Sequence, residues 1–167
     1  MEIGLLLLRL AVGLTMAAHG AQKLFGWFGG PGLDAVGGFF EQLGFVPGRR
    51  NAWMAGAGEF SGGVLLAIGL LTPAAAALLI AIMFVAVMSV HLKNGFFVTT
   101  GGYEYNLVLA VAAASVAFIG PGPLSVDALL GLPLAGAGWG FTAIVIGLAG
   151  GGVALAGRRQ AAPALSK

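Results

Sequence analysis

Long apolar segments recur along the chain, and shorter stretches rich in glycine, proline and charged residues separate them. A helix that crosses a bilayer needs about 20 mostly apolar residues. Five segments of this kind follow one another, at residues 3–25, 52–71, 73–91, 104–119 and 139–157. The pattern therefore predicts an all-α fold, a polytopic bundle of transmembrane helices with five spans.

The loop between the first two segments has a helical pattern of its own. Its apolar residues recur every three or four positions against polar ones, at Leu33, Val36, Phe39, Phe40 and Leu43. This spacing predicts a short amphipathic helix that lies in the membrane interface beside Trp27.

The second and third segments are separated only by Leu71 and Thr72. Thr72 is placed to cap the following helix, and Pro73 suits its first position. We therefore expect a tight antiparallel hairpin. Gly56, Gly58 and Gly62 should let the second span pack closely against the first.

The fifth segment is rich in glycine, so charge placement gives an independent test of whether it spans. With five spans, all Lys and Arg outside the spans fall on one side, at Lys23, Arg49, Arg50, Lys93, Arg158, Arg159 and Lys167. With four spans this bias nearly vanishes. Basic residues concentrate on the cytoplasmic side of membrane proteins. We expect five spans in the plasma membrane, with the N-terminus outside and the C-terminus in the cytoplasm.

Composition supports a membrane location and excludes several functions. The chain is 59% hydrophobic and 8% charged, whereas soluble domains carry about 25% charged residues. Its net charge of +2 is dispersed, which argues against nucleic-acid binding. Cysteine is absent, which excludes a thiolate nucleophile and a Cys-ligated cluster within this chain. The start MEIGLLLLRL lacks a basic region before its apolar run, so we expect a retained span rather than a signal peptide.

Alternating spans bring most of the unusual polar residues to the cytoplasmic leaflet. These candidates for ligand binding or proton relay are His19, Lys23, Glu59, His91, Tyr103, Glu104 and Asn106. Charges within spans are costly and usually face the bundle interior. Side-chain direction disfavours an Arg9–Glu59 pair, whereas His19 and Lys23 lie nearer Glu59 in depth.

Structural roles compete with this interpretation. Lys23, Lys93 and Glu104 at helix ends, and Arg9 within the first span, can extend to the headgroups. Trp27, Trp53, Trp139, Tyr103 and Tyr105 suit interfacial anchors. Haem ligation by the two histidines, or a metal site with Glu59 and Glu104, is disfavoured because no ligand spacing is present. We expect no metal site.

Several segments resemble the DoxX family of small bacterial membrane proteins. They are LLLLRLAVGLTMAAHGAQKLFGWFGG, GAGEFSGGVLLAIGLLTPAAA, HLKNGFF, GGYEYNLVLA and GPGPLSVDALL. The resemblance covers residues 3–131 and implies a four-helix membrane domain there. Residues 132–167 then add a fifth span and a short basic tail. The resemblance also implies a role beside membrane oxidoreductases, but it assigns no catalytic residue to this chain.

The leading hypothesis is a membrane component of a redox system that holds a quinone or docks a soluble oxidoreductase at the cytoplasmic leaflet. No motif for an intrinsic cofactor is visible, so a second redox subunit or soluble partner would supply electrons. A small transporter or proton-coupled channel is the alternative, although no inverted repeat is present. A non-catalytic scaffold is the third possibility.

Overall fold

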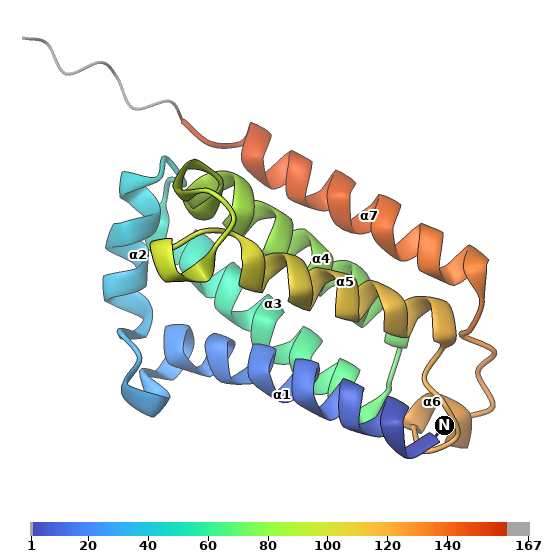
Figure 1. The fold of residues 1–167 in the computed structure, drawn as a ribbon. Helices are drawn as coiled ribbons and strands as arrows, with labels where there is room; N and C mark the ends of the chain where they lie inside the picture. The colour runs from blue at the N-terminus through green and yellow to red at the C-terminus, as the bar shows by residue number, and fades with distance from the viewer. Residues whose placement is uncertain (1, 160–167) are drawn as a thin grey trace, which may run out of the picture.

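The computed structural model describes residues 2–159, which form α-helices and no strands. This confirms the predicted all-α fold. The long helices run side by side in alternating directions (Figure 1). They are α1 (Glu2–Phe25), α3 (Gly48–Ile68), α4 (Thr72–Ala86), α5 (Glu104–Ile119) and α7 (Ala137–Ala156). Lys167, predicted in the cytoplasm, lies outside the described residues.

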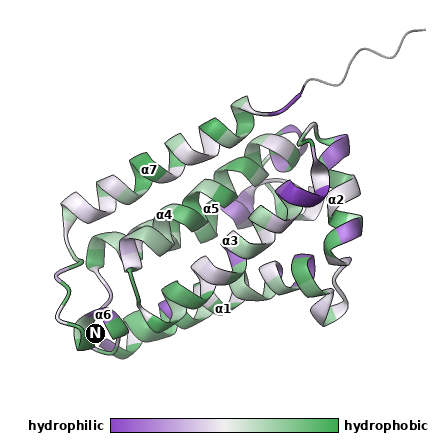
Figure 2. Cartoon of the chain, turned by 180° about the vertical axis from the view of Figure 1, so that it is seen from behind, coloured by the Kyte–Doolittle hydropathy of each residue, from purple (hydrophilic) through white to green (hydrophobic). Residues whose placement is uncertain are grey.

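Apolar residues run along all of the long helices (Figure 2), and many of them are exposed. Leu7 is 60%, Val108 60% and Val145 65% exposed. A soluble helix would present a polar face outward, so this surface suits lipid. Three helices are long and apolar enough to cross a membrane, at Glu2–Phe25, Thr72–Asn94 and Ala137–Ala156. α5 is a shorter apolar helix of 16 residues, and the five-span count stays a prediction.

Small residues let α1 and α3 pack backbone against backbone. A Cβ at Gly63 would lie 2.5 Å from Gly13 O and from Ala17 N, and one at Gly20 would lie 2.4 Å from Phe60 N. Of the predicted contacts, Gly56 does face α1. Gly58 and Gly62 instead face the side chains of α4, so the prediction was wrong for them.

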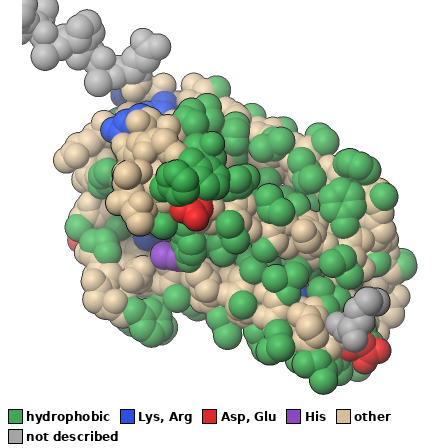
Figure 3. All heavy atoms as spheres, viewed as in Figure 1, with side chains coloured by type: hydrophobic (Ala, Val, Ile, Leu, Met, Phe, Trp, Pro, Cys, Tyr) green, Lys and Arg blue, Asp and Glu red, His purple; other side chains and the backbone are tan. Residues whose placement is uncertain are grey.

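Helix α2 (Gly32–Gln42) is the short helix predicted in the first loop, and it lies across one end of the bundle (Figure 1). The chain beyond α7 returns to this end. Arg158 Nε donates to Leu43 O at 2.9 Å, and Arg159 N donates to Gly44 O at 2.8 Å. Most of the Lys and Arg side chains visible in Figure 3 gather at this end. We call it the basic end.

The turn between α3 and α4 is tight, as predicted, but Thr72 does not cap α4. The Asp127 carboxylate, at the start of α6 (Val126–Leu129), takes this role. It accepts hydrogen bonds from Leu71 N at 2.7 Å, Thr72 N at 2.9 Å and Thr72 Oγ1 at 2.7 Å. A carboxylate at a helix N-terminus satisfies several free N–H groups and complements the helix dipole. It therefore replaces the weaker threonine cap.

α4 changes geometry near the basic end. It continues into the π-helical segment η2 (Val87–His91) and the 3-10 turn η3 (Leu92–Asn94). Another 3-10 turn, η4 (Val98–Thr100), lies in the loop before α5. π segments are rare and occur frequently at functional sites.

Candidate functional site

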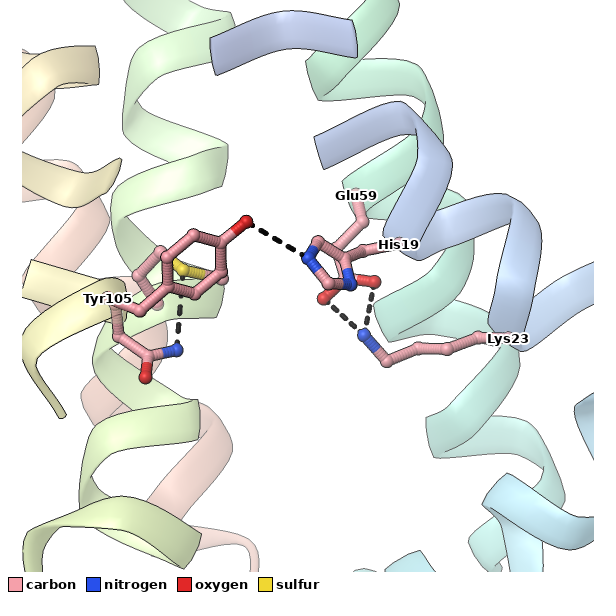
Figure 4. Close-up of polar contacts among 6 residues, drawn as sticks. His19, Lys23, Glu59 and Tyr105 are labelled. Carbon is pink, nitrogen blue, oxygen red and sulfur yellow. Dashed lines mark hydrogen bonds and ion pairs between the residues drawn. The ribbon is translucent and has the colours of Figure 1, made fainter. Parts of the chain in front are cut away.

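The close packing of α1 on α3 brings a lysine and a glutamate together. Lys23 Nζ donates to both carboxylate oxygens of Glu59 (Figure 4). The Glu59 side chain is 4% exposed and that of Lys23 is 25% exposed. The predicted neighbour of Glu59 is therefore present, although its function stays a prediction. A buried carboxylate of this kind needs its cation, because an unpaired charge there is strongly unfavourable.

His19 lies one helical turn before Lys23 and contacts α5. Its Nε2 is 3.2 Å from Tyr105 Oη, and the two rings meet edge to face with centroids 5.9 Å apart. Figure 4 shows the imidazole next to the Glu59 carboxylate, between the ion pair and the tyrosine. Tyr105 was expected to be only an interfacial anchor. The structure makes it part of this cluster.

Three other candidates do not join the ion pair. Asn106 Nδ2 donates to Met83 Sδ at 3.5 Å in the buried contact between α5 and α4. Glu104 Oε2 accepts from Val98 N at 2.9 Å. The Tyr103 ring packs edge to face on Phe96 with centroids 5.5 Å apart. Tyr103 and Glu104 therefore order the loop before α5.

The ion pair lies at the wall of a cavity of about 540 Å³ near the basic end. Its wall comes from the end of α1, from α2 and α3, from the second half of α4 with η2, and from the last turns of α7. Most lining residues are apolar, including Phe40, Ile82 and Val85. The polar side chains on the wall are Lys23, Asn51, Glu59, Ser89 and His91. An apolar pocket with a few converging polar groups is the usual form of a small-molecule site.

The π-helical segment supplies two of these polar groups. His91 Nδ1 lies 2.7 Å from Gly101 O, an interaction that fixes the imidazole against the following loop. Ser89 Oγ is buried and has no hydrogen-bond partner among the residues described. A buried hydroxyl usually has a partner. Ser89 therefore offers a hydrogen bond to a molecule in the cavity.

Sequence reasoning missed Ser89, Asn51 and Tyr105 as site residues. Ser89 is a polar residue inside the predicted apolar span 73–91, and this feature of the sequence could have identified it. Asn51 precedes a predicted span and had no comparable signal. Its Nδ2 donates to Pro47 O at 2.8 Å.

Arg9 lies near the other end of the molecule, away from the cavity. It is 1% exposed and donates to Pro121 O and to Leu124 O. The expectation that Arg9 does not pair with Glu59 is confirmed. The alternative in which Arg9 extends to the headgroups is wrong, because the two terminal nitrogens of its guanidinium donate to backbone carbonyls inside the protein.

Within residues 2–159, no group of three or more His, Asp or Glu side chains could hold a metal ion. The polar groups on the cavity wall are hydrogen-bond donors, a carboxylate and an imidazole. These groups can bind a polar headgroup and exchange protons with it.

Comparisons with known proteins identify a family and a relative of the chain. The family model described as DoxX matches residues 4–92, a range that includes His19, Lys23, Glu59 and His91. A protein of Bacillus subtilis (strain 168) named "Putative oxidoreductase CatD" is 31% identical over 126 residues, which are 75% of this chain and 86% of that protein. No solved structure matches the chain.

Proposed function

The chain belongs to the DoxX family, and from this membership and the cavity we propose that it is a membrane component of a redox system that holds a quinone. The headgroup lies beside Lys23 and Glu59. The observation that carries the proposal is the apolar cavity of about 540 Å³ with polar groups on its wall. The name of the Bacillus subtilis relative supports a redox context.

The donors and acceptors around the cavity fit a quinone headgroup. A lysine ammonium has three N–H donors, and Glu59 takes two of them. The remaining N–H and the unpartnered Ser89 hydroxyl can donate to quinone oxygens. Glu59 and His91 on the same wall can hold the protons that accompany reduction. The electrons come from a soluble oxidoreductase or a second redox subunit that docks at the basic end.

The proposed membrane topology keeps the headgroup within reach of a cytoplasmic partner. It has five spans in the plasma membrane, with the C-terminus in the cytoplasm. The contact of Arg158 and Arg159 with the loop after α2 supports it, because this contact holds α7 and the end of α1 at the same face. Residues 3–131 form the four-helix domain in this proposal, and residues 132–167 form the added span and tail.

Binding of a quinone to the folded state alone raises the thermal midpoint of the purified protein by mass action. We expect a quinone analogue to raise this midpoint, and Ser89→Ala to reduce the shift because one hydrogen bond to the ligand is lost. Ser115→Ala is the matched control, since Ser115 Oγ donates to Val111 O within α5, away from the cavity. The thermal midpoints of the wild-type protein, Ser89→Ala and Ser115→Ala are measured by thermal denaturation in detergent, with and without the analogue.

The absence of any shift across several quinone types contradicts the quinone site. An equal loss of the shift in both serine variants contradicts the role of Ser89. Proton flux that depends on Glu59 without quinone binding would instead support a small proton-coupled transporter. A soluble enzyme that binds without any quinone effect would support a scaffold.

A further inference from the structure

A second hollow runs along the outer contact between α4 and α7. Its volume is about 360 Å³ and its wall is apolar. Small residues of α4, Ala74, Ala77 and Ala81, form one side, and α7 residues from Trp139 to Gly150 form the other. The two helices therefore leave a channel between their side chains, which we call the α4–α7 groove.

The α4–α7 groove continues directly into the headgroup cavity. Leu78, Ala81 and Gly150 line both hollows. Gly150 lies at the junction, and a Cβ built on it would meet no atom within 4 Å. The passage between the two hollows is therefore open at Gly150. A molecule with its polar head beside Glu59 has a continuous apolar path along α7.

The length of the α4–α7 groove limits the part of an apolar tail that it can hold. The stretch of α4 from Ala74 to Ala81, which lines the groove, rises about 10 Å, at about 1.5 Å per residue. The groove therefore holds the first part of a tail that begins at the headgroup cavity, and the rest of a longer tail lies in the lipid.

We infer that the α4–α7 groove holds the isoprenoid tail of the quinone whose headgroup lies beside Lys23 and Glu59. This inference rests on the proposed function and adds the class of ligand, a quinone with an isoprenoid tail. The tail runs from the junction at Gly150 toward Ala74 and Trp139. Because the groove lies on the outer surface of the bundle, the ligand enters sideways from the lipid.

Binding of quinones with one headgroup and different tails tests the inference. The probes carry no tail, a short alkyl tail or a long polyisoprenoid tail, and their affinities are measured in lipid nanodiscs. Gly150→Leu narrows the junction, and Ala74→Phe narrows only the far end. Gly152→Leu is the matched control on α7, because a Cβ at Gly152 also meets no atom within 4 Å but the residue lines neither hollow.

Buried methylenes each contribute to affinity, so blocking the path should weaken the long-tailed probe by about tenfold or more. We expect Gly150→Leu to weaken both tailed probes, Ala74→Phe to weaken only the long-tailed one, and Gly152→Leu to weaken none. The tailless probe should bind the wild-type protein, Ala74→Phe and Gly152→Leu equally, because neither residue lines the headgroup cavity. Partition of the probes into lipid is the same for all four proteins, so it does not affect the comparison.

Unchanged affinity of the long-tailed probe in Gly150→Leu and Ala74→Phe overturns the tail inference and leaves the quinone site standing. Equal weakening of the tailless and long-tailed probes in Ala74→Phe also overturns it, because the groove would then act only through the headgroup cavity. Loss of co-purifying phospholipid in these variants, without loss of quinone affinity, assigns the groove to lipid and overturns it. Failure of every probe to bind the wild-type protein overturns the proposed function and the tail site together.

Discussion

At the scale of single residues, the bundle buries the Glu59 carboxylate together with its only charged hydrogen-bond partner in the described chain, Lys23. Breaking a buried ion pair by removing one partner costs about 3–5 kcal/mol, because the other charge is left uncompensated. We expect Lys23→Met to lower the free energy of unfolding in detergent by about this amount. Glu59→Gln should also destabilise the protein, and the double variant should lose less than the sum of the two.

The same molecule contains a control for this prediction. Arg49 and Asp34 form an ion pair at 2.7 Å, but their side chains are 70% and 85% exposed. Exposed pairs contribute about 0–1 kcal/mol, so Arg49→Met should change stability little. Additive effects of Lys23→Met and Glu59→Gln would show that the two residues do not act as a unit. Addition of His19→Ala to each variant then tests whether the imidazole belongs to the same unit.

At the scale of helices, the ion pair depends on how closely α1 approaches α3. A Cβ at Gly63 would meet backbone atoms of α1 at 2.5 Å, so the two helices must separate to admit it. Overpacking of this kind costs about 1–3 kcal/mol. We expect Gly63→Ala to lower the thermal midpoint and to weaken quinone binding, since Lys23 and Glu59 lie across this contact.

Gly58→Ala on the same helix is the control. Its Cβ would approach the side-chain ends of α4, Ile82 Cδ1 at 3.0 Å and Leu78 Cδ1 at 3.4 Å, and these flexible ends can move. Alanine also favours the helix more than glycine does. We therefore expect Gly58→Ala to leave stability and quinone binding almost unchanged. Similar losses in both variants would show that the α1–α3 contact does not position the site.

At the scale of the whole molecule, the orientation in the membrane can be measured directly. The one-sided distribution of Lys and Arg predicts five spans with the C-terminus in the cytoplasm. A phosphatase reporter fused after Lys167 should be inactive, because this enzyme works only in the periplasm, and a fluorescent cytoplasmic reporter should be active. Phosphatase activity at the C-terminus would contradict the five-span topology.

The sequence predicted the large-scale arrangement better than the local contacts. Apolar length located the helices, and α5 has the predicted bounds at Glu104–Ile119. Helix direction and depth were sufficient to place Lys23 near Glu59 and to separate Arg9 from it. Helix direction and depth follow from the positions of residues along single helices, and these positions can be read from the sequence.

Contacts that depend on rotation about a helix axis, or on distant segments, were not predictable. Gly58 and Gly62 face α4 rather than α1, because nothing in a glycine-rich helix indicates which glycine faces which neighbour. Asp127 replaces Thr72 as the cap of α4 from 55 residues further along the chain. Ser89 joined the cavity wall through a π-helical segment that no sequence pattern indicated.

The carbonyl groups that accept from Arg9 impose an order on biosynthesis. Pro121 is 112 residues downstream, and ribosomes add about 5–20 residues per second, so α1 waits roughly 6 to 20 seconds for this acceptor. Until then the guanidinium lies in the first span without these acceptors, where a charge is costly. The first helix to leave the ribosome is therefore secured only when the turn after α5 closes over it.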